Sequence, residues 1–165
     1  MKRKPVIKKS LLLEKIVAQL VEQLNVIEKA AEASHAEATH ESSRAENKYD
    51  TRGLEAAYLA GGQAKQAREL TESIKMYSSL MPREFGPGDA IDMQALVELE
   101  MDGERSMYFL GPKSGGLEVV CQKEEILVIT PQSPLGQNLL GKKAAQRWKS
   151  KVGAGTVEYF VVGVT

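Results

Sequence analysis

The chain has 165 residues, which allows one compact domain or two small ones. Its 22 Lys and Arg residues balance its 22 Asp and Glu residues, so the bulk charge does not point to nucleic acid as a direct partner. The single cysteine, Cys121, excludes an internal disulfide, and no apolar run approaches the ~20 residues of a membrane span. We therefore expect a cytoplasmic protein that binds no membrane.

The first part of the chain, up to Pro82, carries the apolar pattern of a long helix. Apolar or small residues recur at alternating spacings of four and three, which keeps one stripe facing a partner helix, as in coiled coils. Ser10 is placed to cap this helix, which should end near His40. The predicted seam positions are Leu13, Val17, Leu20, Leu24, Ile27, Ala31, Ser34 and Ala38.

A second helix repeats the spacing and should stop before Pro82. Paired in the opposite order, the two seams share one fold-back point near Ala45, which favours an antiparallel coiled-coil hairpin. The alternative, two helices of a compact bundle, would show wider apolar faces. The second seam consists of Gly53, Ala56, Ala60, Gln63, Ala67, Leu70, Ile74, Tyr77 and Met81.

The turn of the hairpin is predicted at Glu41–Arg44, with the tip at residues 41–46. Ser43 and Glu46 fit the Ser-x-x-Glu capping box, in which each side chain bonds the backbone amide of the other residue. The seam side chains become small toward this end, so the two helices should approach each other closely and the hairpin should be thin there. Gly61 and Gly62 together cost about 2 kcal/mol in a helix, and the seam does not explain them.

Beyond a linker at Phe85–Asp89 the apolar period changes to two. Asp102-Gly103 is a hairpin turn signal, and Ser133-Pro134 suits the start of a short helix. The sequence thus predicts an α+β fold, with a helical hairpin in residues 1–82 and a small antiparallel β-sheet domain with one short helix in residues 83–165. The predicted strands are Ile91–Leu99, Ser106–Leu110, Leu117–Cys121, Glu125–Thr130 and Thr156–Val164, and the predicted helix is Pro134–Lys143.

Two runs of the chain are locally basic. One is at the start of the chain, and the other lies in a stretch without Asp or Glu between Ile126 and Val157. Each is either a solvated surface or a face for an acidic partner. The runs consist of Lys2, Arg3, Lys4, Lys8 and Lys9, and of Lys142, Lys143, Arg147, Lys149 and Lys151.

The run from Ser133 to Lys142 resembles a motif of a known family. It is similar to the Ser-Pro-Leu-Gly-x-x-Leu-Leu-Gly-Lys run in the C-terminal domain of the Gre transcript-cleavage factors, GreA and GreB. The segment Glu46–Asp50 also resembles the family's Ser-Glu-Asn-x-x-Tyr-Asp segment at the hairpin tip. The matching motif positions are Ser133, Pro134, Leu135, Gly136, Leu139, Leu140, Gly141 and Lys142.

The resemblance implies a C-terminal domain with an FKBP-like fold and a monomer that binds bacterial RNA polymerase. Its hairpin would enter the secondary channel and modulate paused or backtracked complexes, touching DNA and RNA only indirectly. The protein would be no enzyme itself, and at most a stimulator of the polymerase's own RNA cleavage. It would need no cofactor of its own, because the metal near the tip would be the Mg²⁺ of the polymerase.

The sequence departs from the family at the tip, where two acids spaced Asp-x-x-Glu hold that metal. One register places Ser42 and Ala45 at these positions, and the other places Ser43 and Glu46 there. A serine hydroxyl does not supply the charge of a carboxylate ligand, so we expect little stimulation of cleavage. The candidates for contact in the channel are Glu41, Ser42, Ser43, Arg44, Glu46 and Asp50.

Two other functions stay open at this stage. An FKBP-like fold suggests a peptidyl-prolyl isomerase. The active-site pocket of such an enzyme needs clustered aromatic residues, and fold alone does not give function. A hairpin with basic patches also suits docking on another RNA–protein machine, such as the ribosome. Leu54, Tyr58 and Leu59, which lie off the seam on the second helix, would be either partly buried or part of a docking face.

Overall fold

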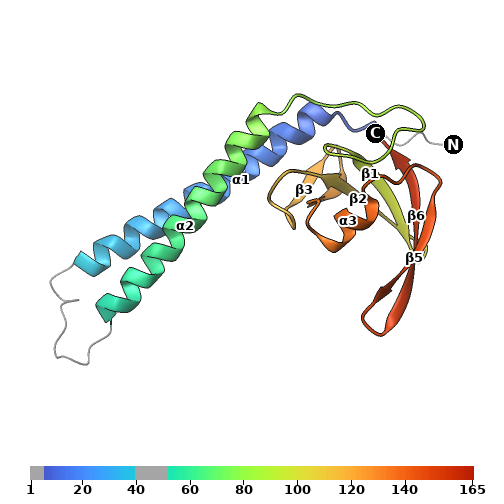
Figure 1. The fold of residues 1–165 in the computed structure, drawn as a ribbon. Helices are drawn as coiled ribbons and strands as arrows, with labels where there is room; N and C mark the ends of the chain where they lie inside the picture. The colour runs from blue at the N-terminus through green and yellow to red at the C-terminus, as the bar shows by residue number, and fades with distance from the viewer. Residues whose placement is uncertain (1–5, 40–51) are drawn as a thin grey trace. The chain divides into compact units, whose positions relative to one another are not determined.

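The computed structural model describes residues 6–39 and 52–165. Two long helices, α1 (Lys9–Thr39) and α2 (Arg52–Ser79), precede a six-stranded sheet that carries one short helix, α3 (Pro134–Leu139) (Figure 1). This order confirms the predicted α+β fold. In these two ranges, no helix combines the length and the apolar character that crossing a bilayer requires.

The chain forms two compact units, one of residues Val17–Met76 and one of Met1–Ile16 with Tyr77–Thr165. The division therefore differs from the expected boundary at Pro82. The physical reason is burial, because Leu12, Ile16 and Tyr77 are at most 1% exposed within the unit that holds the sheet. Both helices thus begin or end inside the sheet-containing unit.

In the helical unit, α1 and α2 run alongside each other in opposite directions (Figure 1). Shielded side chains recur at the predicted seam positions, which confirms the alternating spacing. Ala60 and Met81 are exceptions, since both are exposed and α2 ends before Met81. The predicted seam positions Ala38, Gly53 and Ala56 lie outside the residues whose side chains are described. The shielded seam positions are Val17, Leu20, Leu24, Ile27, Ala31 and Ser34 on α1, and Gln63, Ala67, Leu70 and Ile74 on α2.

The start of α1 differs from the prediction that Ser10 caps it. The helix begins at Lys9, and the Lys8 carbonyl already accepts a hydrogen bond from the Leu12 amide at 3.0 Å. Lys8 therefore occupies the cap position, and its own amide donates to Gln122 Oε1 at 2.8 Å. That bond ties the residue before the helix to a distant part of the chain. The predicted turn at the other end of α1 lies outside the described residues.

The sheet has the strand order β3-β4-β2-β1-β6-β5. All neighbouring strands are antiparallel except β2 and β4, which pair in parallel, an arrangement that the sequence did not predict. The predicted turn at Asp102-Gly103 is confirmed, with positive φ angles of 48° and 86°. The strands are β1 (Leu96–Met101), β2 (Glu104–Leu110), β3 (Glu118–Cys121), β4 (Glu124–Ile129), β5 (Arg147–Val152) and β6 (Gly155–Val164).

Two strand predictions were wrong. The first strand begins at Leu96 rather than Ile91, because the preceding residues turn and Gln94 has a φ of 69°. Strand β5 was missed altogether, because its sequence Arg-Trp-Lys-Ser-Lys-Val looks like a solvated basic run. Pairing with β6 along its whole length, from Arg147 with Phe160 to Val152 with Gly155, makes it a strand.

The sheet buries apolar side chains on both faces. On one face, Leu139 of α3 packs in a cluster with Val97, Leu110 and Val161. Phe109, whose neighbours Tyr108 and Leu110 belong to that cluster, faces the other side and is also fully buried. On that side the Tyr77 hydroxyl donates to the Lys113 carbonyl at 2.7 Å.

The segment after α2 is tied to the start of α1 through a buried charge. Lys9 is 4% exposed, its Nζ donates to the Arg83 carbonyl, and it lies 4.4 Å from the centre of the Phe85 ring. The Arg83 guanidinium approaches the same ring at 4.6 Å and pairs with Asp92 at 2.7 Å. Burial lowers the pKa of Lys9 to about 8. The expected linker is therefore anchored at its start.

Gly61 and Gly62 lie in the unbroken helix α2, and a Cβ built on either would meet no atom within 4 Å. We predict that Gly61→Ala and Gly62→Ala each raise the free energy of unfolding by about 1 kcal/mol, because alanine loses less backbone entropy in a helix. Urea denaturation measures the change. Gly141→Ala is the control, since its φ of +78° penalises a side chain and should lower stability. Loss of stability in Gly61→Ala would contradict the described helix.

Candidate functional site

The tip residues predicted from the sequence lie outside the described residues, as does every residue from 40 to 51. They are Glu41, Ser42, Ser43, Arg44, Glu46 and Asp50. The C-terminal motif, by contrast, is described at every position. The candidate site is therefore built from Ser133–Lys142 and from the surface around it.

Ser133 organises the start of the motif. Its Oγ accepts a hydrogen bond from the Gly136 amide at 3.0 Å and donates one to the Thr130 carbonyl at 2.8 Å. This is the N-cap geometry, and Pro134 follows in the first turn, where its missing amide proton has no cost. The predicted roles of Ser133 and Pro134 in starting the helix are confirmed, although the helix ends at Leu139 rather than Lys143.

The two glycines of the motif have different physical roles. A Cβ on Gly136 would lie 1.9 Å from the Thr130 carbonyl oxygen, so only glycine permits this close approach. Gly141 has a φ of +78° and its amide donates to the Ile91 carbonyl at 2.9 Å, while the Ile91 amide donates to the Lys142 carbonyl at 2.7 Å. The motif therefore turns sharply and is fastened to the segment before β1.

Within the motif, Leu139 is fully buried and Leu135 packs against the same core cluster. Other motif side chains remain at the surface, including Leu140, which is 37% exposed. Its side chain is accessible from the surface of the motif. The exposed residues of this surface are Pro134, Gln137, Asn138, Leu140 and Gly141.

Next to this surface lies an aromatic stack that the sequence did not reveal. The rings of Trp148 and Tyr159 are parallel within 8° and 4.9 Å apart, and the Lys142 Nζ lies 4.7 Å from the centre of the Trp148 ring. Strand pairing brings the two rings together, since Trp148 lies opposite Tyr159. These rings pack on each other instead of lining an open cavity, so nothing in their arrangement favours the isomerase hypothesis.

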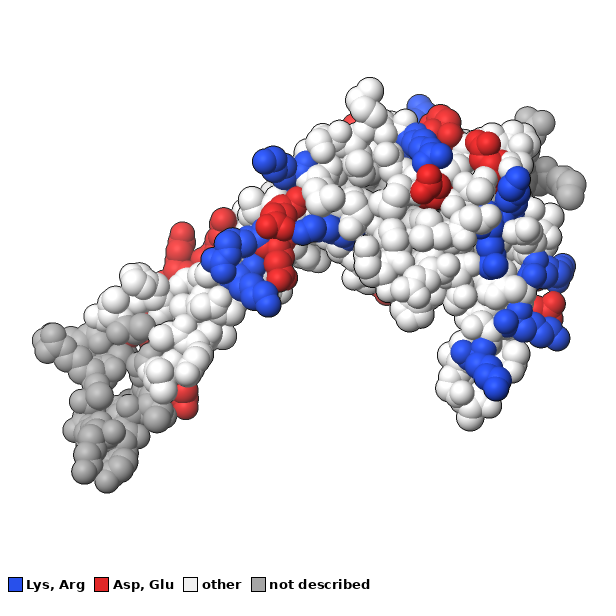
Figure 2. Space-filling view, in the orientation of Figure 1, with Lys and Arg blue, Asp and Glu red and all other residues white. Residues whose placement is uncertain are grey.

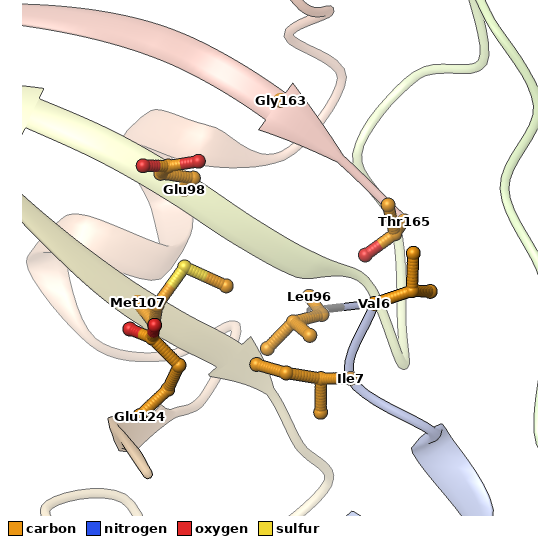
Figure 3. Close-up of a pocket in the computed structure, with 8 residues that line it drawn as sticks. All are labelled: Val6, Ile7, Leu96, Glu98, Met107, Glu124, Gly163 and Thr165. Carbon is orange, nitrogen blue, oxygen red and sulfur yellow. The ribbon is translucent and has the colours of Figure 1, made fainter. Parts of the chain in front are cut away.

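A small pocket lies on the sheet beside the start of the described chain (Figure 3). Its volume is about 170 Å³, below the roughly 300–1,000 Å³ of typical ligand sites. Val6 and Ile7 form one side, Leu96 and Met107 supply apolar surface, and the Glu98 and Glu124 carboxylates lie at its edge. A pocket of this size fits a single side chain better than a nucleotide or a peptide.

The described residues also contain groups that catalysis or metal binding would use. Cys121 is fully buried, and burial raises the pKa of its thiol, which disfavours the reactive thiolate. Across residues 6–39 and 52–165, no three His, Cys, Asp or Glu side chains are grouped as a metal site would need. The motif and the helical arm are therefore the features that bear on function here.

No protein-family model and no curated protein matches this chain. Among solved structures, it is similar to GreA factor homolog 1 (Gfh1) of Thermus thermophilus, with 25% identity, a TM-score of 0.36, and 90% of this chain and 94% of that chain covered. It is also similar to Thermus aquaticus Gfh1, with 26% identity, a TM-score of 0.37, and 89% of this chain and 92% of that chain covered. A third similar structure is the prokaryotic transcription elongation factor GreA/GreB from Nitrosomonas europaea, with 21% identity, a TM-score of 0.37, and 58% of this chain and 78% of that chain covered. At TM-scores this low, no single likeness decides the function.

The motif geometry predicts an unequal response to two small substitutions. Gly136→Ala should lower the free energy of unfolding by about 3 kcal/mol or more, because the new Cβ overlaps the Thr130 backbone. Ser133→Ala should cost about 1–2 kcal/mol, the usual value for a lost N-cap. Thermal or urea denaturation measures both. Asn138→Ala, at an exposed position, is the matched control and should change stability by less than about 0.5 kcal/mol. A fully stable Gly136→Ala protein would contradict this geometry.

Proposed function

We propose that this protein is a transcription factor of the Gre type that binds bacterial RNA polymerase. In this proposal the helical arm enters the secondary channel, and the sheet-containing unit docks at the channel entrance. The main support is the motif Ser133–Lys142, in which Ser133, Gly136 and Gly141 hold the backbone in one defined turn. Its exposed members are then free to contact the polymerase.

The described helices support this role for the arm. Helix α1 has 31 residues and so extends about 45 Å, at about 1.5 Å per residue. Its seam changes from Leu20 and Leu24 to Ala31 and Ser34 toward its C-terminal end. Small seam residues let two helices approach closely, so the arm becomes narrow, as a narrow channel requires.

We further propose that the protein binds in the channel without strong stimulation of RNA cleavage. Stimulation would need a second carboxylate to hold Mg²⁺ beside the polymerase's own metal. In one register Ser42 and Ala45 stand where the two acids belong, and in the other Ser43 replaces the aspartate while Glu46 remains. The metal would belong to the polymerase in either case.

Binding to purified polymerase tests the proposal. The full chain should bind, and replacing residues 36–54 with a short Gly-Ser linker should weaken binding or abolish competition for the channel, by about tenfold or more in affinity. The replacement leaves the base of both helices in place, because Leu12, Ile16 and Tyr77 lie outside it. A chain that does not bind polymerase, or a truncation that binds as tightly, would contradict the proposal.

RNA cleavage by backtracked polymerase complexes tests the second proposal, that the protein stimulates cleavage only weakly. Backtracked complexes incubated with the protein and Mg²⁺ should release few short 3′ RNA fragments. Ser42→Asp with Ala45→Glu, or Ser43→Asp alone, restores the acidic pair in one register or the other and should raise cleavage. Abundant fragments from the unaltered protein that disappear in Glu46→Ala would show that the existing tip already holds the metal.

A further inference from the structure

Strand β5 (Arg147–Val152) forms one edge of the sheet, since it pairs only with β6. In an antiparallel pair, alternate residues bond the neighbouring strand, and the residues between them direct their amide and carbonyl groups outward. An edge strand is therefore a template on which another extended chain can add. β5 has six residues, long enough for several such hydrogen bonds.

The charges of β5 are arranged on one face of this edge. Arg147, Lys149 and Lys151 alternate along the strand, so their side chains share a face at a spacing of about 6.6 Å. Arg147 lies over Phe160 at 4.1 Å and pairs loosely with Glu158 at 3.9 Å. In the described chain, Lys149 and Lys151 make no ion pair. Figure 2 shows Lys and Arg side chains gathered over the β5–β6 hairpin, with little Asp or Glu between them.

The aromatic residues of the β5–β6 hairpin distinguish between two possible anionic partners, a single-stranded nucleic acid and an acidic protein segment. Single-stranded nucleic acid is held by exposed rings on which bases stack. Here the Trp148 ring is stacked on Tyr159 and covered by Lys142, and the Phe160 ring is covered by Arg147. The edge therefore offers backbone hydrogen bonds and alternating cations, and no open ring.

We propose that β5 binds an extended acidic segment of a partner protein by strand addition. Acidic side chains at every second position of that segment would face Arg147, Lys149 and Lys151, because both strands have a period of two. Backbone hydrogen bonds to the open edge supply the affinity, and the charges fix the register. The proposed contact involves the edge of β5 and no residue of the arm, and the variants that test it lie outside the motif, so its outcome is independent of the proposed polymerase binding.

The test uses the full chain labelled with ¹⁵N and the synthetic peptide acetyl-Thr-Glu-Val-Glu-Thr-Glu-Thr-amide. Backbone amide shifts should concentrate on residues 147–152. Lys149→Glu with Lys151→Glu should weaken binding by about tenfold or more. The matched control is Lys8→Glu with Lys123→Glu, which changes the net charge equally near the other edge, where the Lys8 amide bonds Gln122. It should bind the peptide within about twofold of the unaltered chain.

Two further probes separate strand addition from charge attraction. The same peptide with N-methyl groups on alternate backbone amides should lose binding, since it cannot complete the ladder. A second control peptide has the same composition but places its three glutamates next to one another. Equal binding by the N-methylated peptide, or by this rearranged peptide, would overturn the proposal. So would preferential binding of an oligothymidine. If no peptide binds and the Lys149→Glu, Lys151→Glu protein self-associates, the lysines only protect the edge from pairing with other copies.

Discussion

The structure depends on the burial of both helix bases within the unit that holds the sheet. The Tyr77 hydroxyl donates to the Lys113 carbonyl, and a Cβ on Gly111 would lie 2.1 Å from that hydroxyl, so a glycine is required beneath the ring. Leu12 and Ile16 of α1 are fully buried in the same unit. A two-helix arm buries little surface along its length, so its stability comes largely from these bases. Cutting the chain at Pro82 would separate Tyr77 from Lys113 and Gly111, against which it packs.

The arm and the sheet unit use their residues in different ways. Along the arm, packing is confined to the seam, and Gln63 contributes an Oε1 that is buried without a hydrogen-bond partner among the described residues. A polar group at a seam position lowers stability and fixes the pairing of the helices. In the sheet unit, the motif Ser133–Lys142 buries Gly136 and Leu139 and uses its cap and glycines to hold a sharp turn, while Pro134, Gln137, Asn138, Leu140 and Gly141 stay at the surface.

Much of this was predictable where one local rule decides the outcome. The seam follows from a spacing of four and three, the Asp102-Gly103 turn from its residue types, and the Ser133 cap from a hydroxyl placed before proline. Strand β5 and the parallel pairing of β2 with β4 were not predictable, because both arise from contacts between distant segments. The close approach of the Thr130 carbonyl to Gly136 was not predictable either, because it depends on how the folded backbone places that carbonyl. The alternation of Arg147, Lys149 and Lys151 was the one signal that could have revealed β5.

In the proposed complex, the arm reaches into the polymerase. Site-specific photocross-linking would show this, with a photoreactive residue at exposed Ala36 of the arm and a second one at exposed Asn138 of the motif. Ala36 should cross-link to polymerase segments that line the secondary channel, while Asn138 should cross-link to the outer rim of that channel. Cross-links from Ala36 only to the outer surface of the polymerase, or none from either position, would contradict it.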